Sequence, residues 1–210
     1  FLHRMPYLRP LGNSILQNAK QIIFLSTAYR DNVINKYVSK DLQKDIYAKT
    51  CVIPNGISDF WIKNIGKPRT IQNKNEIKLL FVGCINRNKN IMAIVDACSK
   101  CIKHGRAVKL TIVGNVADSG YFSKIIKHSF VSYLPFASAE ELLNIYRAHD
   151  IFVMPSKKES FGLVYAEAMS QGLPIVYTKG QGFDQQFADG EVGFSVDANN
   201  TEEIARKILC

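Results

Sequence analysis

The sequence predicts an α/β fold in which a mostly parallel, doubly wound sheet carries helices on both faces. From residue 76 onward, short apolar runs alternate with helical patterns of about ten residues each. Three of these apolar runs end at Gly83, Gly114 and Pro155, residue types that commonly follow a strand. Strands and helices that alternate in this way form βαβ units, which build parallel sheets.

The first part of the chain is less regular. Residues 1–19 mix apolar and basic side chains and indicate a loop with the remnant of a helix. Residues 21–26 are expected to form a buried strand, and Ser26 or Thr27 is placed to cap the following helix. Residues 50–57 then predict a short strand that ends in a Pro-Asn-Gly turn.

The remaining elements follow from the same patterns in chain order. The expected strands are residues 77–82, 108–113, 130–134, 151–154, 173–177 and 193–196. The expected helices are residues 90–104, 121–127, Ser138 or Ala139 to 147, Ser160 to Gly172, and Asn200 or Thr201 to 208. In such folds, ligands bind at the carboxyl ends of the strands near the topological switch point.

Residues 151–177 form the central unit, a strand, a polar loop, a helix and a second strand. The helix is predicted from Ser160, a plausible N-cap, and from Gly172 and Pro174, which stop it. Apolar residues recur at helical spacing between these signals (Leu163, Ala166 and Met169).

Two carboxylates lie around the start of that helix. Glu159 comes just before the expected N-terminus and Glu167 lies near the end of the second turn. Gly162, in the first turn, leaves the backbone N–H groups uncovered, and such a helix start suits a phosphate. Acidic residues on both sides of an anion site would repel a negatively charged group. They therefore favour a neutral ligand group that carries hydroxyls, and a sugar has such groups.

The segment ESFGLVYAEAMSQGLPIV, residues 159–176, resembles the EX7E element of the retaining family 4 glycosyltransferases. That family has the GT-B fold of two Rossmann-like halves. The resemblance implies that residues 51–210 are the C-terminal donor-binding domain. Residues 1–50 would then be the tail of the N-terminal acceptor domain with the interdomain linker. Because the chain begins at Phe1, not Met, within sequence that is predicted to be structured, we expect a fragment of a longer protein.

The same resemblance implies that the donor is a nucleotide-diphosphate sugar. It assigns Glu167 to the ribose hydroxyls and Glu159 to the hydroxyls of the transferred sugar. The backbone N–H groups of Phe161, Gly162 and Leu163 would meet phosphate or sugar.

The loop after the strand 77–82 resembles the VGR…KN segment of the family, in which an arginine and a lysine stabilise the diphosphate leaving group. Gly83 would permit close approach of the backbone, and Arg87 and Lys89 are the two candidate cations. Cys84 stands where the family usually has Arg or Ser, so Arg87 matches only from a shifted place. Two solvated loop cations are the alternative interpretation.

Two further segments resemble donor-binding turns of the family. Gly114 matches a Val-Gly turn with backbone contacts to the donor, although Asn115 replaces the usual acidic residue. The backbone around Tyr133 and Leu134 corresponds to the loop that flanks the nucleobase, and an ordinary buried strand end is an equal alternative there.

The implied function is transfer of a hexosyl group, with retention, from a nucleotide-diphosphate sugar to a saccharide or lipid-linked acceptor. UDP is the favoured nucleotide, and surface polysaccharide or glycolipid synthesis is the expected context. Because protein cations can neutralise the leaving group, we expect no cofactor and no metal, and the sequence has no Asp-x-Asp. The leaving phosphate itself would take the proton from the acceptor hydroxyl.

Composition limits the partners. The 210 residues carry 27 Lys+Arg against 18 Asp+Glu, a net charge of +9, without an Arg-rich block or zinc-finger pattern. We therefore expect no binding to nucleic acid. We do expect peripheral contact with an acidic membrane surface. No apolar run approaches the roughly 18 residues of a membrane span. The odd count of five cysteines favours a reducing, cytoplasmic location, and Cys98-x2-Cys101 is expected to be helix content rather than a metal site.

Three other functions share the fold. A sugar-nucleotide epimerase generally lacks this EX7E context, and a glycan phosphorylase needs a pyridoxal-phosphate lysine segment that the sequence does not contain. A non-catalytic nucleotide-sugar-binding module is the third alternative. The presence of Glu159, Glu167 and Lys89 argues against this third alternative, although we expect this fragment by itself to be inactive.

Overall fold

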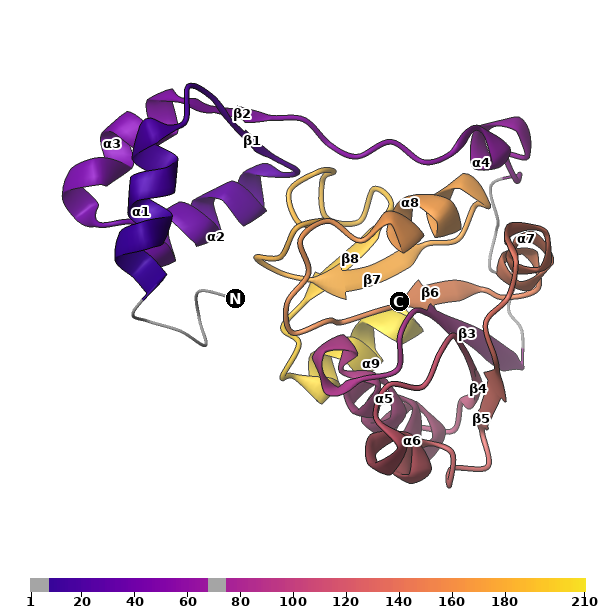
Figure 1. Ribbon diagram of the computed structural model, residues 1–210. Coiled ribbons are helices and arrows are strands. Elements are labelled where there is room, and N and C mark those ends of the chain that lie inside the picture. The colour runs from indigo at the N-terminus through magenta and orange to yellow at the C-terminus, as the bar shows by residue number, and fades with distance from the viewer. Residues whose placement is uncertain (1–7, 68–74) are drawn as a thin grey trace.

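The computed structural model describes residues 8–67 and 75–210. In these ranges the chain forms a small N-terminal unit and a larger α/β unit that a linker connects (Figure 1).

In the larger unit, the described residues form a parallel sheet of six strands. Its order is β5-β4-β3-β6-β7-β8, and all of its pairings are parallel. Chain order along the sheet therefore reverses between β3 and β6, as in the doubly wound nucleotide-binding fold. The strands are β3 (Glu76–Val82), β4 (Ala107–Val113), β5 (Val131–Leu134), β6 (Ile151–Val153), β7 (Ile175–Thr178) and β8 (Gly193–Val196).

Helices cover both faces of this sheet. One face carries α5, α6 and α9, and the other carries α7 and α8 (Figure 1). Their bounds are α5 (Ile91–Lys103), α6 (Ser119–Ile125), α7 (Ala139–Arg147), α8 (Leu163–Ser170) and α9 (Thr201–Leu209). The central strands are almost entirely apolar because both of their faces are buried. The predicted doubly wound α/β fold is confirmed.

The N-terminal unit consists of α1 (Arg9–Asn18), β1 (Ile22–Phe24), α2 (Thr27–Tyr37), α3 (Lys40–Ala48) and β2 (Thr50–Val52). Strands β1 and β2 pair in parallel, with Ile23 opposite Cys51. Ser26 caps α2 by accepting a hydrogen bond from the backbone N–H of Tyr29 at 3.1 Å. The buried core of this unit is small (Phe24, Ile34, Val38 and Ile46).

The linker leads to α4 (Asp59–Lys63), which packs on the larger unit. Trp61 is buried there, with its ring 5.5 Å from that of Tyr146 in α7. The sequence patterns did not predict α3 or α4. Both are short, and α4 is stabilised by the contact of Trp61 with a helix distant in sequence.

Most element positions agree with the sequence predictions, and one helix start needs a correction. Helix α8 begins at Leu163 with Gly162 as its N-cap, so Ser160 is not the cap. Helix α5 holds Cys98 and Cys101 fully buried, and burial raises the pKa of the Cys101 thiol to about 11. The prediction that these cysteines are helix content is confirmed.

Candidate active site

The candidate site lies where the order of the sheet reverses. The loop after β3 and the loop after β6 leave the carboxyl edge of the sheet side by side, because β3 and β6 are paired neighbours. These loops carry Lys89 and Glu159. Diverging loops at such a point leave a crevice that binds ligands in doubly wound folds.

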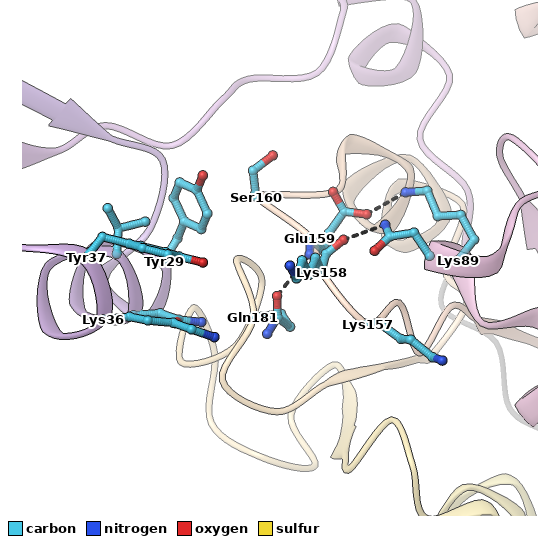
Figure 2. A pocket seen from close by; sticks show the side chains of 12 residues that line it. Tyr29, Lys36, Tyr37, Lys89, Lys157, Lys158, Glu159, Ser160 and Gln181 are labelled. Carbon is cyan, nitrogen blue, oxygen red and sulfur yellow. Dashed lines mark hydrogen bonds and ion pairs between the residues drawn. The ribbon is translucent and has the colours of Figure 1, made fainter. Parts of the chain in front are cut away.

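Lys89 and Glu159 form an ion pair across the two loops. The Nζ atom of Lys89 lies 2.6 Å from Oε2 of Glu159 (Figure 2). The side chains are 21% and 12% exposed, so the pair is largely shielded from water. The structure thus joins two predicted site residues that are 70 positions apart in the sequence.

Hydrogen bonds connect the loop after β3 to the loop after β6. The Nδ2 of Asn88 donates to the carbonyl of Lys158 at 2.9 Å, and the backbone N–H of Lys157 donates to the carbonyl of Asn88 at 2.8 Å. Asn90 has a left-handed backbone (φ 56°), and its buried side chain donates to the carbonyls of Pro155 and Ala198. This network fixes the position of Lys89 relative to Glu159 before any ligand binds.

Gln181 supports Glu159 from the loop after β7. Its Oε1 accepts a hydrogen bond from the backbone N–H of Glu159 at 3.0 Å, and Gly182 donates to the carbonyl of Glu159 at 2.9 Å. Gln181 was not among the site residues predicted from the sequence. The available signal was the Gly-Gln-Gly turn that follows a predicted strand at the same sheet edge.

Gly162 shapes the turn into α8. Its φ of 81° is one that other residues rarely adopt, and an added Cβ would lie 2.5 Å from the ring of Tyr165. Tyr165 is buried and donates its hydroxyl to the carbonyl of Met154 at 2.5 Å, which ties the helix start to the end of β6. Phe161 is buried, whereas Leu163 is partly exposed on the first turn.

Glu167 lies on the side of α8 that faces α7. The hydroxyl of Tyr146 donates to its Oε2 at 3.2 Å. Burial raises the pKa of the Glu167 carboxyl above its usual value, and the hydrogen bond from Tyr146 opposes this shift. Tyr146 is a second residue that the sequence analysis missed, because nothing in the helix pattern of α7 indicates its partner.

Arg87 lies apart from the Lys89–Glu159 pair. Its Nε is 3.0 Å from Oδ2 of Asp118, its guanidinium lies over the ring of Tyr121, and its side chain is 69% exposed. The assignment of Arg87 as a leaving-group cation therefore stays a prediction.

A cavity of about 240 Å³ lies at the carboxyl ends of β3 and β4, and its lining residues do not include Tyr133 or Leu134, which were predicted to flank the nucleobase. Gly83 and Gly114 line it at the ends of β3 and β4, where an added Cβ on Gly114 would lie 2.2 Å from the carbonyl oxygen of Gly83. The hydroxyl of Tyr133 donates to the carbonyl of Gly114 at 3.1 Å, and Leu134 is partly exposed. Phe136, which the sequence analysis did not single out, also lines this cavity and is 72% exposed.

The Lys89–Glu159 pair opens onto a larger cleft of about 570 Å³. Helix α2 forms the opposite wall with Tyr29, Lys36 and Tyr37 among its lining residues (Figure 2). Within residues 8–67 and 75–210, no cluster of three or more His, Cys, Asp or Glu side chains could hold a metal ion. No helix in the described part of the chain is long and apolar enough to cross a membrane.

Sequence comparison places the chain in a family. The sequence model of the family described as Glycosyl transferases group 1 matches residues 63–209, and the chain belongs to this family. An uncharacterized glycosyltransferase of Methanocaldococcus jannaschii is 29% identical over 233 aligned positions, which cover 96% of this chain and 59% of that relative. D-inositol 3-phosphate glycosyltransferase of Pseudarthrobacter chlorophenolicus is 35% identical over 136 positions, 60% of this chain and 32% of that relative.

Structural comparison agrees on the fold. Anabaena HepE in complex with UDP-glucose has a TM-score of 0.76 at 19% identity, over 99% of this chain and 58% of that one. Sucrose-phosphate synthase of Thermosynechococcus elongatus has a TM-score of 0.73 at 22% identity, over 97% of this chain and 52% of that one. The predicted resemblance to GT-B glycosyltransferases is confirmed. The chain spans less than two thirds of the length of each of these proteins.

Proposed function

We propose that this chain is the donor-binding part of a retaining glycosyltransferase. It takes a hexosyl group from a nucleotide-diphosphate sugar, with UDP favoured, for transfer to a saccharide or lipid-linked acceptor. The observation that carries this proposal is the Lys89–Glu159 pair, 2.6 Å apart at the point where the sheet order reverses. The relatives named as glycosyltransferases and the neighbour that binds UDP-glucose support the same class.

In this proposal each site residue is assigned one role. Lys89 faces the crevice and neutralises charge that develops on the departing diphosphate, which is electrostatic stabilisation of the transition state. Glu159 holds hydroxyls of the transferred sugar, and Glu167 accepts hydrogen bonds from the ribose. The backbone N–H groups at Phe161, Gly162 and Leu163 lie at the start of α8, where the helix dipole favours phosphate.

The bond that breaks joins the anomeric carbon to the diphosphate oxygen, and the bond that forms joins that carbon to the acceptor oxygen on the same face. The acceptor proton passes to the leaving phosphate. Because Lys89 supplies the positive charge, the proposed reaction needs no metal. We place the enzyme in the cytoplasm at the inner face of the membrane, in surface polysaccharide or glycolipid synthesis.

Two substitutions separate the proposed roles. Glu159→Ala is expected to lower transfer by the full-length enzyme about 10²–10³-fold while UDP affinity changes little, since this residue contacts the sugar. Glu167→Ala is expected to weaken UDP binding to this chain about tenfold, since each lost charged hydrogen bond costs roughly 1.5 kcal/mol or more. Calorimetric titration with UDP, GDP and UDP-sugars, without metal, measures the binding.

Glu140→Ala is the matched control, because Glu140 is exposed on α7 away from both loops. It should leave UDP affinity and transfer unchanged. If Glu159→Ala and Glu167→Ala behaved like this control, the site assignment would be wrong.

A further inference from the structure

The linker helix α4 lies beside α7 and α8 (Figure 1). Trp61 is 4% exposed, and its ring lies 5.5 Å from that of Tyr146 in α7, at an angle of 79°. An edge-to-face contact of this kind stabilises beyond the burial of apolar area. Just after α4, the carbonyl of Asn64 accepts a hydrogen bond from Nη2 of Arg147 at 2.8 Å. Trp61 and Asn64 thus fasten the linker to two consecutive residues of α7.

The linker is also fastened to the end of α8. The backbone N–H of Gly66 donates to the carbonyl of Ser170, the last residue of α8, at 2.8 Å. The contact is close, since an added Cβ on Gly66 would lie 2.7 Å from the carbonyl oxygen of Gln171. Arg147 joins the two helices here, because its Nε donates to Oε1 of Gln171 at 3.0 Å. Residues 61–66 therefore hold α7 and α8 in one arrangement.

The ring of Tyr146 is enclosed where these elements meet. It is fully buried and contacts Trp61 of the linker and Phe152 of β6, whose ring centroid lies 6.1 Å away. Burial and the charge of Glu167 raise the pKa of the Tyr146 hydroxyl well above its usual value. The hydroxyl therefore stays protonated and donates to Oε2 of Glu167. The position of the ring sets the direction of this bond, and Trp61 limits that position from the linker side.

The bond from Tyr146 to Glu167 is sensitive to small displacements. Its oxygens are 3.2 Å apart, longer than the roughly 2.7–2.8 Å that is commonest for O–H···O bonds. A smaller side chain in place of Trp61 would leave space into which the Tyr146 ring can move, and a small movement breaks the bond. With Oε2 held, Oε1 of Glu167 has no hydrogen-bond partner in the described part of the chain. The bond therefore orients the carboxylate and leaves one oxygen for a ligand.

Leu142 connects this arrangement with the cavity of about 240 Å³ at the ends of β3 and β4. It lines that cavity and lies four residues before Tyr146 in α7, on the same side of the helix. The side of α7 that bonds to Glu167 therefore continues into the cavity.

We propose that Trp61 and Tyr146 are positioning residues for nucleotide binding. The linker holds the ring of Tyr146, and the hydroxyl of Tyr146 orients Glu167 toward the ribose of the donor. This inference rests on the proposed function, which assigns the ribose to Glu167. The position of the linker between the two units then sets the affinity for the nucleotide through one tyrosine hydroxyl.

The fluorescence of Trp61 gives the first test, because Trp61 is the sole tryptophan of the chain. Saturating UDP should change its emission in the wild type, since a ribose bound to Glu167 alters the bond to Tyr146 and thereby the packing against Trp61. Tyr146→Phe should abolish most of this change at saturating UDP. A purely structural role of the Tyr146 hydroxyl would leave the change in place.

Calorimetric titration with UDP gives the second test. Tyr146→Phe and Trp61→Leu should each weaken UDP binding about three- to tenfold, because each loses the bond that orients Glu167. Since both changes remove the same bond, the double variant should bind UDP within twofold of the weaker single variant. Trp61→Phe retains an aromatic ring and should lose less affinity, and it takes the place of Trp61→Leu if circular dichroism shows that Trp61→Leu is unfolded.

Tyr177→Phe is the matched control. Tyr177 is a buried tyrosine of β7, and its ring contacts Tyr165 and Phe183 rather than the linker. This variant should keep both the fluorescence change and a UDP affinity within twofold of wild type.

The outcomes separate the positioning role from the proposed function. If Tyr146→Phe and Trp61→Leu bound UDP like the control while Glu167→Ala bound it weakly, the positioning role would be wrong and the proposed function would stand. Losses that multiply in the double variant, or Trp61 emission that does not respond to UDP in the wild type, also overturn the role of the linker. If UDP does not bind the wild-type chain, the proposed function fails and the positioning role fails with it.

Discussion

Glu167 carries its carboxyl group at a place where burial disfavours the charge. The hydroxyl of Tyr146 donates a hydrogen bond to Oε2 at 3.2 Å, and this bond offsets part of the cost of burying the charge. In the proposed function, the ribose diol of the donor supplies further donors to the same carboxylate. The charged form of this carboxyl group therefore lowers the stability of the fold, and perturbed ionisable groups of this kind are common at functional sites.

The pH dependence of stability tests this account of Glu167. Burial raises the folded-state pKa above the unfolded-state value, so this group stabilises the fold most when both states are protonated. That contribution is lost as the pH rises from the ordinary carboxyl value of about 4.3 through the raised pKa. Glu167→Gln should therefore unfold at a higher temperature than wild type at neutral pH, and the difference should vanish at low pH.

Thermal unfolding followed by circular dichroism across this range measures the effect. Tyr146→Phe supplies a second variant, because it removes the hydrogen bond that lowers the pKa of Glu167 and should move the transition to higher pH. Parallel curves for wild type and Glu167→Gln at every pH would contradict a raised pKa.

At the scale of elements, the site depends on how loops leave the sheet. The turn from β6 into α8 must carry Glu159 toward Lys89 and then start a helix within a few residues. Gly162 makes this turn with its left-handed backbone, while Tyr165 packs against it and bonds back to Met154. The site is thus built on the ends of rigid elements, which favours pre-organisation.

Gly162→Ala should destabilise the chain by about 2–4 kcal/mol, from backbone strain and from the clash with the Tyr165 ring. Urea denaturation measures the free energy of unfolding, and the dependence of this free energy on urea concentration should be the same for the variant and the wild type. Gly56→Ala is the control, because an added Cβ there has no neighbour within 4 Å. A change within about 0.5 kcal/mol for Gly162→Ala, typical of surface substitutions, would show that the turn tolerates a side chain.

At the scale of the whole molecule, the chain consists of two units whose hydrophobic cores differ in size. The larger unit has an extensive core that includes Trp61, whereas the N-terminal core contains few buried side chains. Strand β2 pairs with β1, so residues 50–52 lie in the N-terminal sheet. The junction that we propose therefore falls just after Val52, two residues beyond the boundary that the sequence suggested.

Residues 53–210 should fold alone with a cooperative thermal transition, because α4 and its buried Trp61 remain attached. Residues 8–52 alone should show no cooperative transition, since so short a segment buries too little apolar surface. Circular dichroism melts of the two pieces provide the measurement. Loss of cooperative unfolding in residues 53–210 would mean that the larger unit needs the N-terminal unit.

Much of this protein could be predicted from local sequence patterns. The alternation of apolar runs and helices predicted the fold class. Of the paired candidates for three helix starts, the structure selects Ser26, Ser138 and Asn200 as the N-caps. Glu159 and Lys89 were singled out through the family resemblance, and their roles stay proposals. Such predictions succeed because strand burial and helix capping depend on residues within a few positions of each other.

Other features were decided by the tertiary structure. The ion pair between Lys89 and Glu159, the support of Glu159 by Gln181 and the bond from Tyr146 to Glu167 all join distant segments. The same holds for Arg87, which the fold brings to Asp118 rather than to Glu159. The sequence by itself determined the elements and the residue types at their ends. Strand order determined which of those ends meet, because only the packed sheet brings the loops after β3, β6 and β7 to one edge.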